Sequence, residues 1–202
     1  MIQKVVPFFS NTKDDTHCVQ ATLRMILKYF IPGKNFSWKK LDKISKKERG
    51  KGTWFHPALI WFADNGFKVI DIELFDYKKF CSEREKYVYK SFSKIVAEYY
   101  LKESNLMKVK KYIPEFLKKV NVEKRSPTIK EIEKLLDLDY LVTVDLNANV
   151  LDNEKGYNGH AVLIIGHNKD TLLLHDPGLP PHKNRIVTKK LFNKAWSKKY
   201  GS

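Results

Sequence analysis

The chain has 202 residues, 43% of them hydrophobic, which suits one domain with a real core and excludes a disordered protein. Lysine and arginine number 38 against 23 aspartates and glutamates, which gives a net charge of +15. Lysine dominates and is spread along the whole chain, without an arginine-rich arm or a recognition-helix motif. A solvated basic surface is therefore favoured, and nucleic-acid binding stays open as a less favoured alternative.

The cysteine content and the hydropathy pattern predict a compartment. Two cysteines, Cys18 and Cys81, are too few for a disulfide framework. The first 15 residues lack the apolar run of a signal peptide, and no segment approaches the roughly 18 apolar residues of a membrane span. We therefore expect a cytoplasmic protein in which Cys18 is a free thiol, whereas Cys81 is expected to be structural.

The N-terminal part of the chain predicts helices. Apolar residues recur at helical spacing from Val19 to Phe30, and Asp14, Asp15 or Thr16 could cap this helix; we expect Asp15 to serve only as a cap. In chain order the predicted elements are an extended segment or short strand at 5–9, helices at 14–30, 37–45 and 56–66, and a strand at 67–75.

Residues 76–122 differ from the rest because they are densely charged and aromatic, with a helical pattern. We expect them to form a helical insertion in a single domain that spans residues 1–202. The elements predicted after this segment are a helix at 128–137 and strands at 140–147, 159–166 and 171–178, the last two joined as a hairpin. Helices followed by an antiparallel sheet predict an α+β fold.

The hairpin carries two residues of chemical interest, His160 at its start and Asp176 at its end. If the turn is centred on Asn168, His160 and Asp176 lie directly opposite each other on one face, at the open end. A slip of one residue would place them on opposite faces. His175 is expected to point to the other face.

Cys18 lies at the predicted start of a helix, where unpaired N–H groups and the helix dipole stabilise a thiolate. A nucleophilic thiol also needs a histidine that takes and returns a proton, and a third group that orients this histidine. His160 and Asp176 are candidates for these two functions. A metal site is not expected, because the chain has no Cys-x-x-Cys pair and His17 would need a distant partner.

The stretches VPFFSN, DDTHCVQATLRMILKYF, GHAVLIIG and LHDPG together resemble papain-like cysteine peptidases, most closely those related to the bacteriocin-processing, double-glycine-leader group. The resemblance covers residues 1–75 and 128–178. It implies a papain-like fold with N-terminal helices packed on an antiparallel sheet. It also implies a catalytic triad, because Cys18, His160 and Asp176 occupy the positions of the family's nucleophile, base and orienting residue.

Two features differ from the family pattern. The family usually has a glutamine about six residues before the cysteine, which donates to the oxyanion. Here Asn11, seven residues before Cys18, carries the same carboxamide and is expected to serve with the Cys18 backbone N–H. The family's Cys-Gly is replaced by Cys18-Val19, which narrows the site or alters which substrates fit. Gln20 follows the nucleophile and is not assigned the oxyanion role.

The resemblance implies a thiol hydrolase that cleaves a peptide or isopeptide bond through an acyl-enzyme, without a cofactor, and whose partner is a peptide or protein substrate. An acyltransferase or a glutamine deamidase on the same fold would share the acyl-enzyme. A non-catalytic basic binding protein that retains the scaffold is the third alternative. The sequence does not predict the substrate or the oligomeric state.

Overall fold

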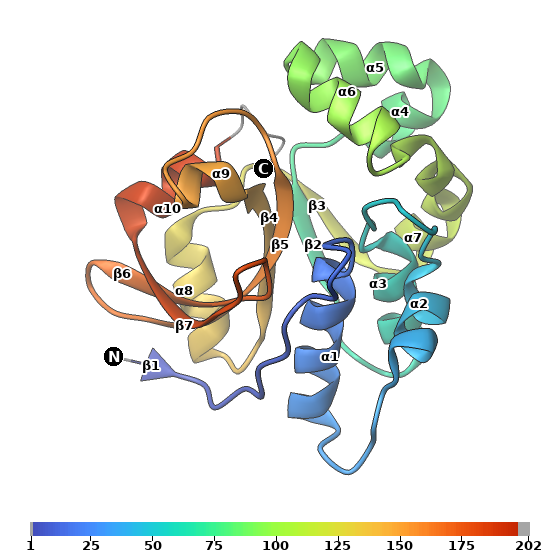
Figure 1. The fold of residues 1–202 in the computed structure, drawn as a ribbon. Helices are drawn as coiled ribbons and strands as arrows, with labels where there is room; N and C mark the ends of the chain where they lie inside the picture. The colour runs from blue at the N-terminus through green and yellow to red at the C-terminus, as the bar shows by residue number, and fades with distance from the viewer. Residues whose placement is uncertain (1, 198–202) are drawn as a thin grey trace.

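The computed structural model describes residues 2–197 and shows a mixed α and β architecture (Figure 1). All strand pairs of the five-stranded sheet are antiparallel, as predicted for an α+β fold. The order β1-β5-β6-β7 places β5 inside the sheet, and β4 pairs with the same edge of β5 as β1. These strands are β1 (Ile2–Gln3), β4 (Val142–Asn147), β5 (Gly159–His167), β6 (Thr171–Asp176) and β7 (His182–Thr188).

Helices cover both faces of this sheet. On one face lies α1 (Cys18–Phe30), whose Met25 packs in one cluster with Leu163 of β5. On the other face lie α8 (Ile129–Asp137) and α10 (Lys189–Ala195), and there Leu136 and Phe192 pack with Ile164. Because successive residues of a strand point to opposite faces, the continuous apolar run of β5 supplies both cores. The short helix α9 (Ala148–Leu151) follows β4.

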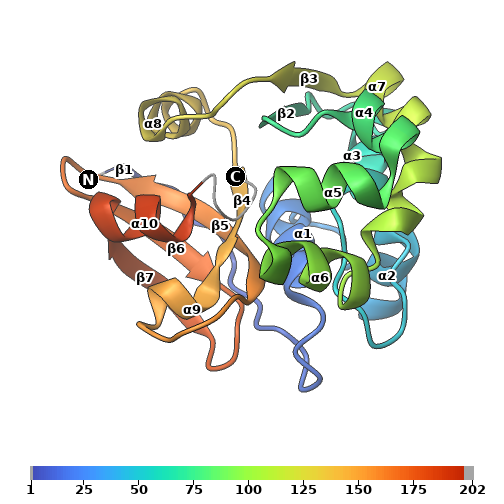
Figure 2. The ribbon, with the colours of Figure 1, turned by 90° about the horizontal axis from the view of Figure 1, so that it is seen from above.

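A second group of helices lies across α1 from the sheet (Figure 2). It contains α2 (Trp38–Ser45) and α3 (His56–Asp64), at the positions predicted for them. Residues 77–119 add further helices, whose Phe80 and Phe116 are fully buried in one cluster with Ile60 of α3. These are α4 (Tyr77–Glu83), α5 (Glu85–Ser91), α6 (Lys94–Lys102), the 3-10 helix η1 (Leu106–Tyr112) and α7 (Ile113–Lys119).

The predicted strand at 67–75 is present in shortened form as β2 (Ile70–Glu73), but it does not join the antiparallel sheet. It pairs in parallel with β3 (Asn121–Lys124), which begins inside the segment predicted to be helical. The lead-in at 5–9 is not a strand, because β1 ends at Gln3, and Pro7 has no N–H group to donate to a sheet. The strand β7 and the helix α10 were not predicted.

The turn of the β5–β6 hairpin is centred beyond Asn168. The side-chain oxygen of Asn168 accepts the N–H groups of Asp170 and Thr171 at 2.9 and 2.7 Å, so it closes a turn that follows it. Next to the turn, His167 consequently lies opposite Leu172. In a turn centred on Asn168, His167 would instead lie opposite Lys169.

A β-bulge at residues 164–166 shifts the register further along the hairpin. Beyond the bulge Leu163 lies opposite His175, so the predicted direct pairing of His160 with Asp176 is wrong: they are offset diagonally. They nevertheless share one face, as predicted. The position of the turn shifts the pairing by an odd number of residues, which would exchange the faces of β6 relative to β5. The single extra residue of the bulge in β5 shifts the pairing once more, so His160 and Asp176 return to the same face.

Candidate active site

Cys18 is the first residue of α1, and its helix end is left without a side-chain cap. The N-cap residue is His17, not Asp15, so the expected capping role of Asp15 is wrong. Asn11 accounts for the difference: its Oδ1 accepts the His17 N–H at 2.7 Å, and its Nδ2 donates to Asp15 Oδ1 at 2.7 Å. The first N–H groups of α1 therefore have no carboxylate cap and can stabilise a negative charge beside the thiol.

Polar contacts fix the loop of residues 11–17 before α1, and the side chain of His17 takes part in them. Thr12 and Thr16 donate their hydroxyls to Asp14, and these hydrogen bonds, led by that of Thr12, hold the pKa of Asp14 well below its usual range. The two ring nitrogens of His17 lie 3.2 Å from Asp14 Oδ1 and 3.4 Å from Asp42 Oδ1. His17 thus serves as a link between the loop and α2.

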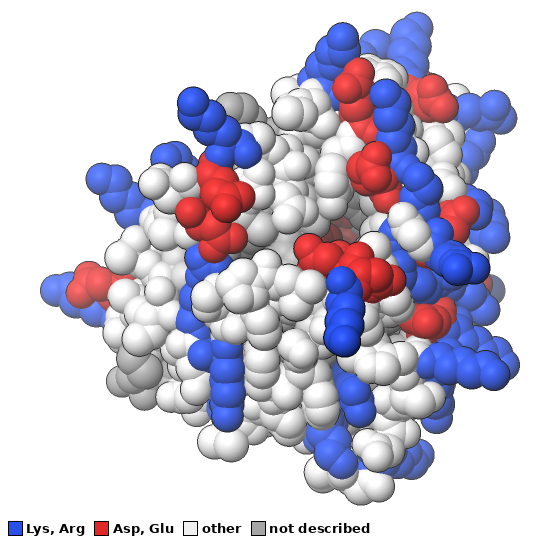
Figure 3. All heavy atoms as spheres, in the orientation of Figure 1, with Lys and Arg blue, Asp and Glu red and all other residues white. Residues whose placement is uncertain are grey.

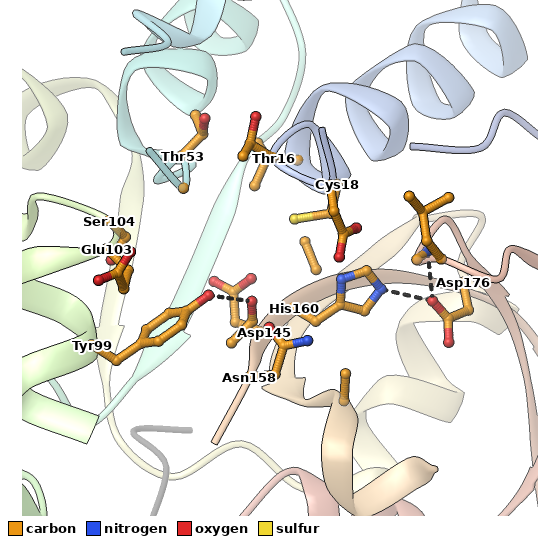
Figure 4. A pocket seen from close by; sticks show the side chains of 18 of the residues that line it. Thr16, Cys18, Thr53, Tyr99, Glu103, Ser104, Asp145, Asn158, His160 and Asp176 are labelled. Atoms are coloured by element: carbon orange, nitrogen blue, oxygen red, sulfur yellow. Dashed lines mark hydrogen bonds and ion pairs between the residues drawn. The ribbon is translucent and has the colours of Figure 1, made fainter. Parts of the chain in front are cut away.

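His160 and Asp176 form a buried hydrogen bond, with 2.7 Å between Nε2 and Oδ1 (Figure 4). The other carboxylate oxygen of Asp176 accepts from Arg185 at 2.8 Å, and the Gly178 N–H donates to Oδ1 at 3.0 Å. Asp176 is therefore held from three sides, which fixes the orientation of the imidazole. His175 points to the other face, as predicted, where its Nε2 lies 2.9 Å from the Val6 carbonyl oxygen.

The electrostatics of this pair favour an ionised imidazole. Burial alone would lower the pKa of His160, but the hydrogen bond and charge of Asp176 and the nearby Cys18 thiol raise it to about 10. Burial likewise acts to raise the pKa of Asp176, yet the His160 contact and the donations from Gly178 and Arg185 hold it well below its usual range. Both shifts favour the charged form of the group concerned, an imidazolium on His160 and a carboxylate on Asp176.

The Cys18 side chain projects from the start of α1 into the cleft, beside the His160 ring (Figure 4), with which it interacts. The fold thus brings together a thiol near the N-terminus with an imidazole and a carboxylate on the C-terminal hairpin. Cys18 is only partly buried, and it lines a cavity. Cys81 packs at the edge of the helical cluster, and burial raises the pKa of its thiol despite the opposing charge of Lys110.

A cavity of about 220 Å³ opens beside the thiol, lined by residues from both halves of the molecule. Cys18, His160 and Asp176 line it from α1 and the sheet, and Tyr99 lines it from α6. Asp145 of β4 lines this cleft, where part of its surface is open to solvent although many protein atoms surround it. The resulting desolvation raises the pKa of Asp145 to about 6, whereas the charge of His160 acts to lower it. The arrangement is a cleft with a thiol, an imidazole and a carboxylate at one side.

Asn11 and Gln20, the two amide residues considered for the oxyanion role, lie outside the cleft lining. Asn11 is buried, and one of its two amide hydrogens is committed to Asp15, which does line the cleft. Gln20 points into the packing against α2, where its Nε2 donates to Ser45 Oγ at 2.8 Å. The Gln20 amide is thus a buried structural group.

Arg185, Tyr99 and Asp145 are cleft residues that sequence reasoning missed. Arg185 lies on β7, a strand that was not predicted, so nothing tied it to Asp176. Tyr99 lies in the segment for which the family resemblance gave no counterpart. Asp145 could have been noticed as a lone carboxylate in the apolar strand YLVTVDLN, where burial of a charge calls for a reason.

Comparisons with known proteins complete the description. A family model described as the Peptidase_C39 like family matches residues 2–202. No curated protein and no solved structure gives a significant match. Within residues 2–197, no helix is long and apolar enough to cross a membrane, and no group of three or more metal-ligating side chains is positioned to hold a metal ion.

Proposed function

Since the chain belongs to the Peptidase_C39 like family, we propose that it is a papain-like cysteine peptidase that cleaves a peptide or isopeptide bond through an acyl-enzyme. The observation that carries the proposal is the buried 2.7 Å hydrogen bond between His160 and Asp176, with the Cys18 side chain beside the same imidazole. Asp176 has the role of orienting His160 and stabilising its cationic form.

The proposed reaction begins with the Cys18 thiolate beside the His160 imidazolium. The sulfur attacks the scissile carbonyl carbon, and a tetrahedral intermediate forms. His160 gives its proton to the leaving nitrogen as the C–N bond breaks, which releases the amine and leaves a thioester on Cys18. Water then attacks the thioester while His160 accepts its proton. Cleavage of the C–S bond releases the acid and restores the thiolate–imidazolium pair.

The oxyanion of the tetrahedral intermediate needs two donors. The Cys18 backbone N–H at the uncapped start of α1 is the first. The second proposed donor is the Asn11 carboxamide, through the Nδ2 hydrogen that Asp15 does not take. Asn11 lies outside the cleft lining, but its backbone N–H donates to the Pro177 carbonyl oxygen at 2.7 Å, which ties its loop to the residue that follows Asp176.

The test is turnover of a mixed peptide library, with new termini identified by mass spectrometry and the Cys18→Ala variant as control. We expect the wild-type protein to release cleaved peptides and the variant to release none. Acid quenching should trap an acyl adduct on Cys18 in the wild-type protein. Equal cleavage by Cys18→Ala would contradict the proposal. Release of ammonia or formation of a new amide would instead assign a deamidase or an acyltransferase.

A further inference from the structure

The end of α6 and the turn after it, residues 99–104, form a wall of the cleft opposite the thiol (Figure 4). Tyr99 donates its hydroxyl to the Gly159 carbonyl oxygen at 3.1 Å, directly before His160. The contact is so close that a Cβ atom at position 159 would lie 2.9 Å from Tyr99 Cε1. The wall is therefore docked on the strand that carries the imidazole.

The same turn is also fixed to the loop that precedes α3. The Gly52 N–H donates to the Glu103 carbonyl oxygen at 2.9 Å, and Trp54 Nε1 donates to the Ser104 carbonyl oxygen at 2.9 Å. Held from two sides, the wall keeps its side chains at a defined distance from the thiol. Rigid positioning of this kind is what a specificity-determining surface needs.

The cleft is acidic although the protein is basic. Besides Asp176, its lining contains four carboxylates, those of Asp15, Glu103, Asp145 and Asp152. None of the lysines in the described part of the chain lines it, although lysine and arginine together number 38. Figure 3 shows acidic side chains beside the hollowed centre of this face and basic side chains mainly around its rim.

Arg185, which is the single lysine or arginine among the described lining residues, does not neutralise this cleft. Its guanidinium is already engaged by Asp176 at 2.8 Å and by Asp152 at 2.6 Å. Glu103 in the wall and Asp145 beside it are the lining carboxylates nearest Tyr99 (Figure 4). Burial raises the pKa of Tyr99, and electrostatic interactions with Cys18, Asp145 and Glu103 raise it further. All four residues line the same cavity.

We propose that this wall selects a substrate with a lysine or arginine side chain close to the scissile bond, which Glu103 and Asp145 bind. This inference rests on the proposed peptidase function and names its substrate class. A cationic side chain in the cleft is attracted by both carboxylates, whereas an acidic side chain is repelled by them. Glu103 is the residue of the two that is best suited to mutation, because its side chain is exposed at the rim and can be replaced without loss of packing.

The inference is tested first by binding, so that it does not depend on turnover. Fluorescent peptides that differ only in one position, Lys, Ala or Glu, are titrated against the Cys18→Ala protein. We expect the lysine peptide to bind about tenfold more tightly than the glutamate peptide, with alanine between them. Adding Glu103→Gln should weaken lysine binding about threefold, the effect of one exposed charge, and Glu103→Lys should abolish the preference.

Glu98→Gln is the matched control, because it removes the same charge from α6 at a residue outside the cleft lining. It should leave the lysine preference unchanged. Wild-type protein is then assayed with the same peptides, expecting the same order in kcat/KM. Equal binding of all three peptides, or an equal effect of Glu98→Gln and Glu103→Gln, would overturn the inference. Selective binding without any turnover would overturn the peptidase proposal alone.

Discussion

At the scale of single residues, the site depends on how Asp176 is held. Its carboxylate connects the imidazole of His160 to the guanidinium of Arg185, and all three groups belong to neighbouring strands of one sheet. Removing the Asp176 charge therefore affects both partners. It lowers the pKa of His160 toward its ordinary value and leaves the Arg185 cation with Asp152 and the Leu151 carbonyl oxygen.

We predict that Asp176→Ala lowers kcat about 100-fold or more, because the imidazole loses both its orientation and its charge partner. Asp176→Asn should retain part of the activity, since its amide oxygen can still accept from His160. The His160 pKa, measured by NMR, should fall in both variants. Asp170→Asn, a matched change in the turn of the same hairpin, should alter neither quantity; a similar loss there would contradict the assigned role.

The same contact makes stability depend on pH. His160 has a raised folded-state pKa, so its contribution is complete below about 6.5 and is lost as pH rises toward about 10. Asp176 has a lowered pKa, so its contribution is present above about 4 and is lost at lower pH. The stability advantage of wild type over Asp176→Ala in urea unfolding should therefore be larger at pH 5.5 than at pH 9.

At the scale of elements, the helix α1 and the β5–β6 hairpin create the site. The periodicity of residues 19–30 and the apolar runs of the hairpin were sufficient to predict these elements. The shared face of His160 and Asp176 was predicted from a turn centred on Asn168, and it holds because the bulge compensates for the different turn. The bulge at 164–166 was not predicted, because Gly166 was read as the end of the strand at 159–166, whereas β5 continues through it. A local hydrophobic pattern predicts which side chains of one strand share a face, whereas the register between two strands depends on contacts made by the whole sheet.

Gly159 connects the hairpin to α6, because its carbonyl oxygen accepts a hydrogen bond from Tyr99. The Tyr99 ring lies so close that there is no room for a side chain at position 159. We predict that Gly159→Ala lowers the free energy of unfolding by about 1–3 kcal/mol, as overpacking does, and also lowers kcat/KM by displacing His160 or the wall. Urea unfolding and peptide turnover measure the two effects.

Gly33→Ala is the control for this prediction, because nothing lies within 4 Å of a Cβ atom added there. It should change stability by less than about 0.5 kcal/mol. In a Tyr99→Ala background the penalty of Gly159→Ala should shrink, since the nearest obstructing ring is gone. An unchanged penalty in that background would show that the Tyr99 contact is not its cause.

At the scale of the whole molecule, α1 lies between the sheet with its covering helices and the helical cluster of residues 77–119 (Figure 2). The cleft opens where these two parts meet at the start of α1. The sequence predicted the helical character of most of the second part but not its place beside the thiol. The contacts of Tyr99, Glu103 and Ser104 that put it there join residues about 50 to 60 positions apart, and no local pattern encodes them.

The global charge proved a poor guide to the cleft. A net charge of +15 describes a surface dominated by lysines, whereas the charged side chains that line the cleft are mainly acidic. Net charge constrains solubility and non-specific binding, but the arrangement of a few side chains decides what a site attracts. A basic protein with an acidic cleft is therefore consistent with a peptidase for basic peptides.

The most direct test of the central claim is the rate of iodoacetamide alkylation at Cys18 and Cys81, measured by mass spectrometry in the native and the urea-unfolded protein. In the native state at pH 7, Cys18 should react at least about tenfold faster than Cys81, because only Cys18 faces an imidazolium. Unfolding should bring the two rates together. Equal, slow alkylation in the native protein would contradict the account, as would a Cys18 advantage that survives unfolding.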